Sequence, residues 1–236
     1  MVGLSKRMEA VCGLLTPGGV LADVGCDHGL VSVAMVQRGI VPSAIAMDLR
    51  EGPLSRARER IDRCGLSDRI ETRLSDGVTA LAPGEADAIL IAGMGGEVIL
   101  HILSCGERVF GSAAEVILQP QSQIDRVRRY LRENDYCIVA EDMVCEDGKY
   151  YPMMRVLNGR DTRKPSALED LYGPLLLENA HPVLREFLVW EEKRLLRIEA
   201  ELTQTAFSAK TQKRLEELHR QINDNRNAMQ RCGIRT

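Results

Sequence analysis

The stretch Val-Leu-Ala-Asp-Val-Gly-Cys-Asp-His-Gly at residues 20–29 decides the fold. An apolar run ends there in Asp23-Val24-Gly25, and a second apolar run, residues 44–47, ends at Asp48. This spacing is typical of a nucleotide-binding βαβ unit. The glycine lets the backbone approach a ligand where a Cβ would collide, and a carboxylate at the end of the next strand can accept both hydroxyl hydrogens of a ribose. The pattern therefore predicts a ligand with a nucleoside part.

The glycine turn argues against a dinucleotide. It reads Asp-x-Gly-x-Asp-x-Gly and lacks the Gly-x-Gly-x-x-Gly fingerprint of dinucleotide-binding proteins. Asp23 and Asp27 would also repel a diphosphate at this turn. A cofactor with a ribose and no phosphate fits better, and S-adenosylmethionine, with S-adenosylhomocysteine as its product, is the common one.

Two further apolar runs end in small or acidic residues. Ser75-Asp76-Gly77 follows residues 70–74, and Ala-Gly-Met-Gly-Gly at 92–96 follows residues 88–91. An ordinary tight turn could explain any one of these ends. Ligands in open parallel sheets bind outside the carboxyl ends of the strands, so four such ends favour a cofactor site on one edge of a sheet.

The spacing of apolar residues predicts an α/β fold up to about residue 160. Strand-like runs alternate with helix-like segments, which indicates βαβ units and a mostly parallel sheet. Two closely spaced runs, 136–140 and 151–157, have no helix between them and predict an antiparallel hairpin that closes this sheet. The expected strands are 20–24, 44–48, 70–74, 87–91 and 115–119, and the expected helices are 4–15, 29–38, 52–64, 95–105 and 122–133.

The remainder, residues 161–236, predicts a helical tail. Residues 158–165 are expected to form a linker, and residues 182–230 carry leucines and isoleucines at helical spacing with almost no glycine or proline. Two helices that fold back near residues 203–209 would pair these apolar stripes in a short coiled-coil hairpin. The alternative is a helical pair that merely caps the first domain.

Composition and charge indicate the compartment of the protein and the kinds of partner it can bind. The chain has 236 residues, 44% hydrophobic and 28% charged, and its seven cysteines form no Cys-x-x-Cys pair. We therefore expect a cytoplasmic protein with reduced thiols, no bound metal and no membrane contact. Residues 1–159 carry 17 Lys and Arg against 22 Asp and Glu, whereas residues 160–236 carry 14 against 12. The tail thus holds the better basic clusters for a polyanion, although a solvated helix face would look the same.

Five motifs give the chain a resemblance to a known family. They are Leu-Ser-Lys-Arg at 4–7, Ala-Asp-Val-Gly-Cys-Asp-His-Gly at 22–29, Ala-Gly-Met-Gly-Gly at 92–96, Leu-Gln-Pro-Gln at 118–121 and Glu-Asp-Gly-Lys-Tyr-Tyr at 146–151. Together they resemble the bacterial tRNA (adenine-N1)-methyltransferases that act on adenosine 22, a branch of the class I S-adenosylmethionine-dependent methyltransferases. The chain departs from the family pattern at Gly29-Leu30-Val31, where the family reads Ala-Tyr-Leu, and at Gln121, where it reads Asn.

The resemblance implies a Rossmann-like sheet, S-adenosylmethionine as methyl donor, and a coiled-coil tail that helps to hold the tRNA. Within that frame, Asp23 and Gly25 are expected to bound the methionine part of the donor, and Asp48 to bind the ribose. The remaining expected donor contacts are Leu49, Asp76, Gly77, Gly93 and Met94. The expected substrate contacts are Lys6, Arg7, Gln119, Tyr150, Tyr151, Lys193, Arg194, Arg197, Lys213 and Arg214.

The expected catalytic residues are Asp27, His28 and Gly95. Enzymes that methylate exocyclic amino groups carry Asn/Asp-Pro-Pro-Tyr at the fourth strand end, and this chain has none, so a ring nitrogen is the better acceptor. Adenine N1 has a lone pair and no proton, and its methylated ring is cationic. A carboxylate such as Asp27 can stabilise that charge, with His28 orienting it or the base. The alternatives are a helix N-cap for Asp27 and a core or capping histidine for His28.

Two other classes of protein compete with this interpretation. The first is an NAD-dependent oxidoreductase on the same sheet, which the missing fingerprint disfavours. The second is a non-catalytic adapter that binds nucleic acid through the tail, which the carboxylates at the cofactor edge disfavour.

Overall fold

The chain up to residue 163 forms a seven-stranded sheet in the order β3-β2-β1-β4-β5-β7-β6. This computed structural model describes residues 2–163, 166–204 and 208–235. The first five strands pair in parallel, and β7 pairs antiparallel with both β5 and β6, so the predicted fold class is confirmed. The strands are β1 (Leu21–Val24), β2 (Ala44–Asp48), β3 (Ile70–Leu74), β4 (Ala88–Met94), β5 (Glu115–Pro120), β6 (Tyr136–Glu146) and β7 (Lys149–Asn158).

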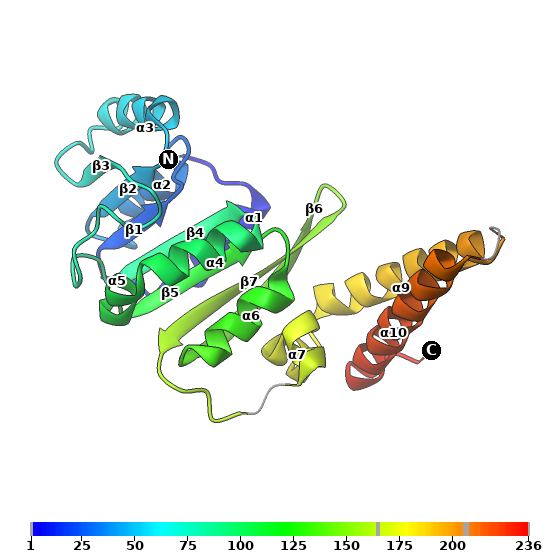
Figure 1. Ribbon diagram of the computed structural model, residues 1–236. Helices are drawn as coiled ribbons and strands as arrows, with labels where there is room; N and C mark the ends of the chain where they lie inside the picture. The colour runs from blue at the N-terminus through cyan, green and yellow to red at the C-terminus, as the bar shows by residue number, and fades with distance from the viewer. Residues whose placement is uncertain (1, 164–165, 205–207, 236) are drawn as a thin grey trace. The chain divides into compact units, whose positions relative to one another are not determined.

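Helices cover both faces of the sheet, which explains why β1, β2 and β5 are buried along their whole length. Figure 1 shows α4, α5 and α6 over the face toward the viewer and α1 and α2 behind the sheet. The helices of this part are α1 (Lys6–Gly13), α2 (Leu30–Gln37), α3 (Glu51–Arg63), α4 (Gly96–Cys105), α5 (Glu107–Ser112) and α6 (Ile124–Glu133).

The strand order reverses at β1. From β1 the chain moves outward to β2 and β3, and it then crosses back to β4 on the other side of β1. The helices that follow β1 and β4 leave toward opposite faces, so a crevice opens at the carboxyl ends of these two strands. The turns at residues 25–29 and 93–96 lie at this crevice.

Strand β4 differs from the prediction. We expected it to end at residue 91, but it continues to Met94, and its pairing with β5 shifts between Ala92 and Met94. The shift coincides with Gly93, whose φ of +79° favours glycine. The sequence also did not reveal α5, because six residues are too few for a helical period to be recognised.

The chain divides into two compact units, Met1–Lys164 and the tail, Pro165–Thr236. The helices α9 and α10 pack through Leu195, Leu218 and Ile222, so the predicted helical hairpin is confirmed. Part of the expected turn, residues 205–207, and part of the expected linker, residues 164–165, lie outside the described residues. The helices of the tail are α7 (Ala167–Tyr172), α8 (Pro174–Glu178), α9 (Pro182–Thr203) and α10 (Ala209–Arg231).

Candidate active site

A cavity of about 710 Å³ opens at the carboxyl ends of β1, β2, β3 and β4, where the sequence placed a cofactor site. Residues from the N-terminal segment before and within α1 complete its wall. The predicted site residues that line it are Arg7, Asp23, Gly25, Asp27, Asp48, Leu49, Asp76, Gly77, Gly93 and Met94.

Asp23 is the most deeply buried carboxylate of the cavity, with 3% of the residue exposed. Its Oδ2 accepts hydrogen bonds from the backbone N–H and the hydroxyl of Ser32, at 3.3 and 2.7 Å. Burial raises the pKa of Asp23 from 3.8 to about 6, although Ser32 partly opposes the shift. The side chain is thus fixed at the cavity floor, and its pKa lies well above that of an ordinary aspartate.

Gly25 follows β1 with a φ of +72°, a left-handed backbone conformation that favours glycine. A Cβ at this position would lie 2.2 Å from the terminal methyl of Met94. The backbone conformation therefore favours glycine, whereas the contact could be relieved by movement of the flexible Met94 side chain.

Asp48 ends β2 and is nearly buried. Its Oδ1 accepts a hydrogen bond from the backbone N–H of Arg50 at 2.9 Å, which fixes the carboxylate at the cavity edge. Next to it, the Leu49 side chain is exposed, with 63% of the residue accessible, although it lines the cavity. An apolar side chain left open beside a carboxylate suits a ligand with a ribose and a flat ring.

Gly77 and Ile102 shape the opposite wall. A Cβ on Gly77, whose φ is +56°, would lie 2.9 Å from Ile102 Cγ1. Glycine therefore allows Ile102 of α4 to reach the cavity, while the neighbouring Asp76 remains exposed at its edge.

Asp27 and His28 form a contact at the mouth of the cavity. The Asp27 side chain is 66% exposed, and its Oδ1 lies 3.5 Å from His28 Nε2. His28 Nδ1 in turn accepts a hydrogen bond from Arg56 Nε of α3 at 3.2 Å. Asp27 adopts a φ of +50°, and the N-cap of α2 is Gly29, so Asp27 does not cap that helix. His28 is 35% exposed and does not line the cavity, so it is no core histidine either.

Arg7, Gln119 and Gly93 form a network behind the cavity wall. Gln119 is fully buried, and its Oε1 accepts hydrogen bonds from Arg7 Nη1 at 2.7 Å and from the Gly93 backbone N–H at 3.2 Å. Its Nε2 donates to the Pro120 carbonyl. Both polar atoms of Gln119 are thus engaged within the protein, and the predicted direct substrate contact from this side chain does not fit the geometry.

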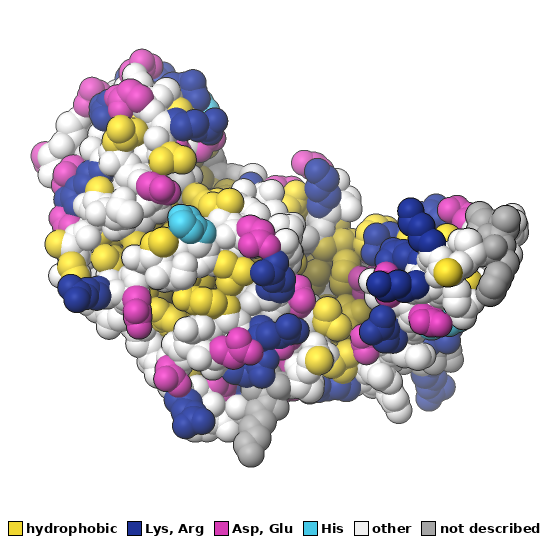
Figure 2. Space-filling model, viewed as in Figure 1, with side chains coloured by type: hydrophobic (Ala, Val, Ile, Leu, Met, Phe, Trp, Pro, Cys, Tyr) yellow, Lys and Arg dark blue, Asp and Glu magenta, His cyan; other side chains and the backbone are white. Residues whose placement is uncertain are grey.

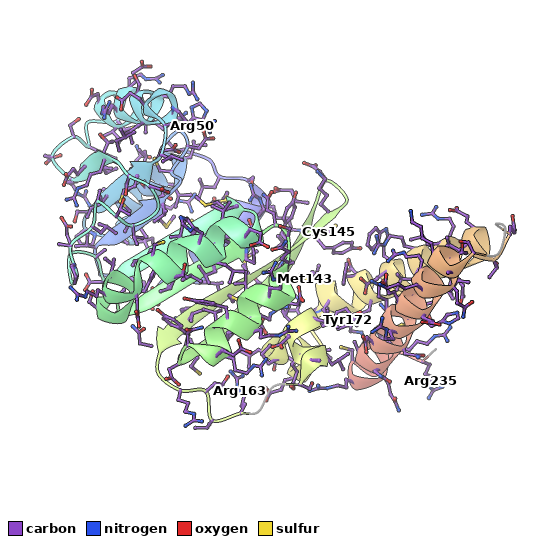
Figure 3. All side chains as sticks on the ribbon, viewed as in Figure 1. Arg50, Met143, Cys145, Arg163, Tyr172 and Arg235 are labelled. Atoms are coloured by element: carbon purple, nitrogen blue, oxygen red, sulfur yellow. The ribbon has the colours of Figure 1, made fainter. Side chains whose placement is uncertain are left out.

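The β6–β7 hairpin holds the N-terminal segment in place. Glu146 accepts hydrogen bonds from the Arg7 backbone N–H at 2.9 Å and from the Ser5 hydroxyl at 3.3 Å. Lys6 Nζ donates to the carbonyl of Cys145 at 3.2 Å, on the hairpin arm labelled in Figure 3. The Arg7 guanidinium also lies 5.1 Å from the centre of the Tyr151 ring. The hairpin thus brings together Lys6, Arg7 and Tyr151 beside the cavity. Tyr150, the residue before Tyr151 in β7, points to the opposite face of the strand.

Gly95 and the tail residues lie elsewhere. Gly95 is the N-cap of α4, where close packing against Ser122 leaves little space, and it does not line the cavity. In the second unit, Figure 2 shows Lys and Arg side chains gathered on the visible face of α9 and α10. The predicted tail contacts Lys193, Arg194, Arg197, Lys213 and Arg214 are all exposed.

The described residues contain no group of three or more His, Cys, Asp or Glu side chains arranged for a metal ion. Nor does any helix within this part of the chain have the length and apolar character needed to cross a membrane. From the sequence, Ser32, Arg50 and Arg56 were not singled out, and Gln121 was named only as a departure from the family pattern. Ser32 and Arg56 act only through contacts between separate elements, and no local pattern marks them.

The fold and the cavity fit a class I methyltransferase, and comparison with known proteins shows this class. Residues 4–154 match the family described as "Methyltransferase domain". The chain is 32% identical over 219 residues to the tRNA (adenine(22)-N(1))-methyltransferase of Bacillus subtilis (strain 168), covering 91% of this chain and 92% of that protein. The chain belongs to the tRNA (adenine(22)-N(1))-methyltransferase family.

Two crystal structures extend this comparison. The B. subtilis m1A22 tRNA methyltransferase TrmK superimposes with a TM-score of 0.87 at 29% identity, covering 97% of this chain and 100% of that one. A Streptococcus pneumoniae relative in complex with S-adenosyl-L-methionine gives a TM-score of 0.85 at 31% identity, covering 96% and 100%. Family membership decides against the oxidoreductase alternative.

Proposed function

We propose that this chain transfers the methyl group of S-adenosylmethionine to N1 of adenine 22 in tRNA. The observation that carries the proposal is the cavity in which Asp23, Asp48 and Asp76 converge from three strand ends. The B. subtilis relative is named for this reaction, and the S. pneumoniae relative binds the same donor.

The residues present fit this donor. Asp23 Oδ1 makes no hydrogen bond to the described residues and is available to the ammonium group of the methionine part, while Gly25 lets the backbone approach it. Asp48 Oδ2 is likewise available to the ribose hydroxyls. Asp76 accepts from the adenine amino group, and Leu49, Gly77 and Met94 line the remaining space.

The acceptor site lies between Asp27 and Gly93. The lone pair of adenine N1 forms the new bond to the methyl carbon while the methyl–sulfur bond breaks and its electron pair stays on sulfur, which leaves S-adenosylhomocysteine. The positive charge thereby passes from the sulfonium to the adenine ring, where the Asp27 carboxylate stabilises it. His28, whose Nδ1 accepts from Arg56, carries its proton on Nε2 and directs it toward Asp27. We assign Gly95 a role in forming the start of α4, because it makes no contact in the cavity.

N1 lies on the Watson–Crick edge, so the target base must leave its pair before it reacts. Tyr151, which lies beside the cavity with Arg7, is a better candidate to stack on it than Tyr150, which points to the opposite face of β7. We assign Gln119 a positioning role, since it holds Arg7 and the Gly93 backbone together. Lys6 and Arg7 form the wall that the acceptor nucleotide meets.

We assign residues 1–160 to catalysis and residues 161–236 to holding the tRNA. The exposed basic residues Lys193, Arg194, Arg197, Lys213 and Arg214 are the phosphate contacts of this tail. A tRNA substrate places the activity in the cytoplasm.

Mass spectrometry of nucleosides from tRNA incubated with the protein and the donor tests this function. The expected product is N1-methyladenosine, with no product from a matched tRNA that carries guanine at position 22. Binding of the donor and of tRNA without any methylated product would instead support the non-catalytic adapter.

A further inference from the structure

Exposed acidic residues lie at the cavity mouth, and the proposed tRNA contacts in the tail do not account for how RNA phosphates could approach them. The catalytic part of the chain has an excess of acidic residues, and Asp27 and Asp76 are both exposed at the cavity. A tRNA that delivers adenine 22 to this cavity must bring its own phosphates close to these carboxylates. Some local positive charge has to offset that repulsion.

Helix α3 supplies such charge on the side that faces Asp27 and His28. Arg56 donates through Nε to His28 Nδ1 at 3.2 Å, and Arg60, one turn later, donates through Nε to the His28 carbonyl at 2.9 Å. Arg50, which is labelled in Figure 3 next to this helix, lines the cavity itself. Arg56 and Arg60 therefore contact the loop that carries Asp27, and Arg50 lines the cavity that Asp27 also lines.

The charge of Arg56 and Arg60 is not neutralised within the part of the chain that the structure describes. Both donate to neutral partners, an imidazole nitrogen and a backbone carbonyl, and neither forms an ion pair there. Arg58, on another side of the same helix, differs, because it is bound to Glu51 and to the Thr72 hydroxyl. Figure 2 shows Lys and Arg side chains over α3 at the top of the first unit.

We propose that Arg50, Arg56 and Arg60 form a binding site for an RNA backbone phosphate next to the target nucleotide. This proposal rests on the proposed function, because it assumes that tRNA presents a base to the cavity. Arg56 is the central member of the site. Its Nε is used by His28, while Nη1 and Nη2 make no hydrogen bond to the described residues, and this leaves the planar fork free to bind phosphate oxygens.

The proposed arginine site and the tail contacts have different roles in tRNA binding. Phosphate contacts fix the register of a nucleic acid on a protein. A contact one nucleotide from the reacting base determines whether that base reaches the cavity, whereas tail contacts retain the tRNA as a whole. The effect of Arg56 should therefore persist when the tail charges are altered.

The variant Arg56→Ala tests the site, with Arg58→Ala as the matched control. The affinity for tRNA is measured without donor over a series of salt concentrations, and donor affinity is measured separately by calorimetry. Arg56→Ala should weaken tRNA binding by about tenfold and reduce the log–log salt slope by about one, while donor affinity stays unchanged. Arg58→Ala should leave tRNA affinity and slope unchanged, and Arg56→Lys should keep most of the slope.

An unchanged salt slope and tRNA affinity in Arg56→Ala would overturn the proposal. A lower turnover in the same variant would then leave Arg56 as a residue that only positions His28. Because tRNA binding is measured without catalysis, this outcome is distinct from failure of the proposed function. That failure would appear as wild-type protein that forms no N1-methyladenosine.

Discussion

The Ser32 hydroxyl donates a 2.7 Å hydrogen bond to Asp23 Oδ2, and this bond holds a buried carboxylate at the floor of the donor cavity. Burial favours the neutral acid and raises the pKa of Asp23 to about 6, while Ser32 opposes the shift. At Asp23, binding of a proton therefore competes with binding of a positively charged ligand.

This relationship predicts that donor affinity depends on pH. Below about pH 6 Asp23 is protonated and loses its attraction for the ammonium group of the donor, so affinity should fall by up to about tenfold per pH unit. Calorimetric titrations between pH 5 and pH 8 measure this dependence. Asp23→Asn should bind the donor weakly at every pH, and a variant that keeps the wild-type pH profile would contradict the assignment.

The same shift affects folding of the donor-free protein in a defined direction. The folded-state pKa of Asp23 lies above its ordinary value of 3.8, so the folded protein binds more protons between about pH 4 and pH 6. The contribution of Asp23 to stability should thus improve as pH falls through this window. The difference in unfolding free energy between wild type and Asp23→Asn, followed across this range, checks the sign.

A second prediction concerns Asp48. Asp48→Ala removes the charge-assisted hydrogen bonds to the ribose, and it should weaken donor binding by about 1–3 kcal/mol. The control is Asp68→Ala, because Asp68 is an exposed carboxylate away from the cavity. An unchanged dissociation constant in a folded Asp48→Ala protein would defeat the ribose assignment.

A third prediction concerns Asp27. Its φ of +50° makes asparagine a better substitute than alanine, because asparagine tolerates the left-handed conformation. Asp27→Asn should lower turnover on tRNA by about a hundredfold while donor affinity stays nearly unchanged. A comparable loss in donor binding would place Asp27 in the cofactor site.

The fold was largely predictable because its signals are local. Strands β1 and β2 are mostly apolar runs, and the residues at their carboxyl ends, Asp23, Gly25 and Asp48, all line the same cavity as expected. The limits of β4 were not predictable. Its last residues read as a glycine turn, and only pairing with β5 keeps residues 92–94 in the strand.

Residues that act through distant partners were the least predictable. Nothing near Gln119 in the sequence shows that Arg7, over a hundred residues earlier, occupies its oxygen and removes it from the surface. Arg56 likewise follows from the packing of α3 against the loop that carries His28. Conversely, the positions and spacing of the residues alone did not predict which reaction the protein catalyses. The resemblance of the five motifs to a known family predicted it.

A fourth prediction concerns stability of the first unit. Arg128 of α6 and Glu141 of β6 form an ion pair at 2.9 Å, with side chains 2% and 0% exposed. Arg128→Ala would leave a buried charge without this partner and should cost about 3–5 kcal/mol in unfolding free energy. Replacing both residues by apolar side chains, as in Arg128→Met with Glu141→Leu, should cost much less. Urea denaturation measures both, and equal losses for the two variants would show that the pair itself is not responsible.

The last prediction concerns the tail. Lys193, Arg194 and Arg197 are exposed on α9, while the apolar contacts of that helix run through Leu195, so their charges can be reversed without disturbing the helix pair. Changing all three to Glu should weaken tRNA binding strongly and flatten its salt dependence by about one unit of log–log slope for each phosphate that the variant no longer binds. Donor affinity and melting temperature should stay close to wild type, because the donor cavity lies in the first unit. Arg108→Glu, an exposed reversal on α5, controls for a general effect of added negative charge. If the triple variant kept the tRNA affinity and salt slope of wild type, the basic face of α9 would not be a contact surface, and the tail would serve only as a structural appendage.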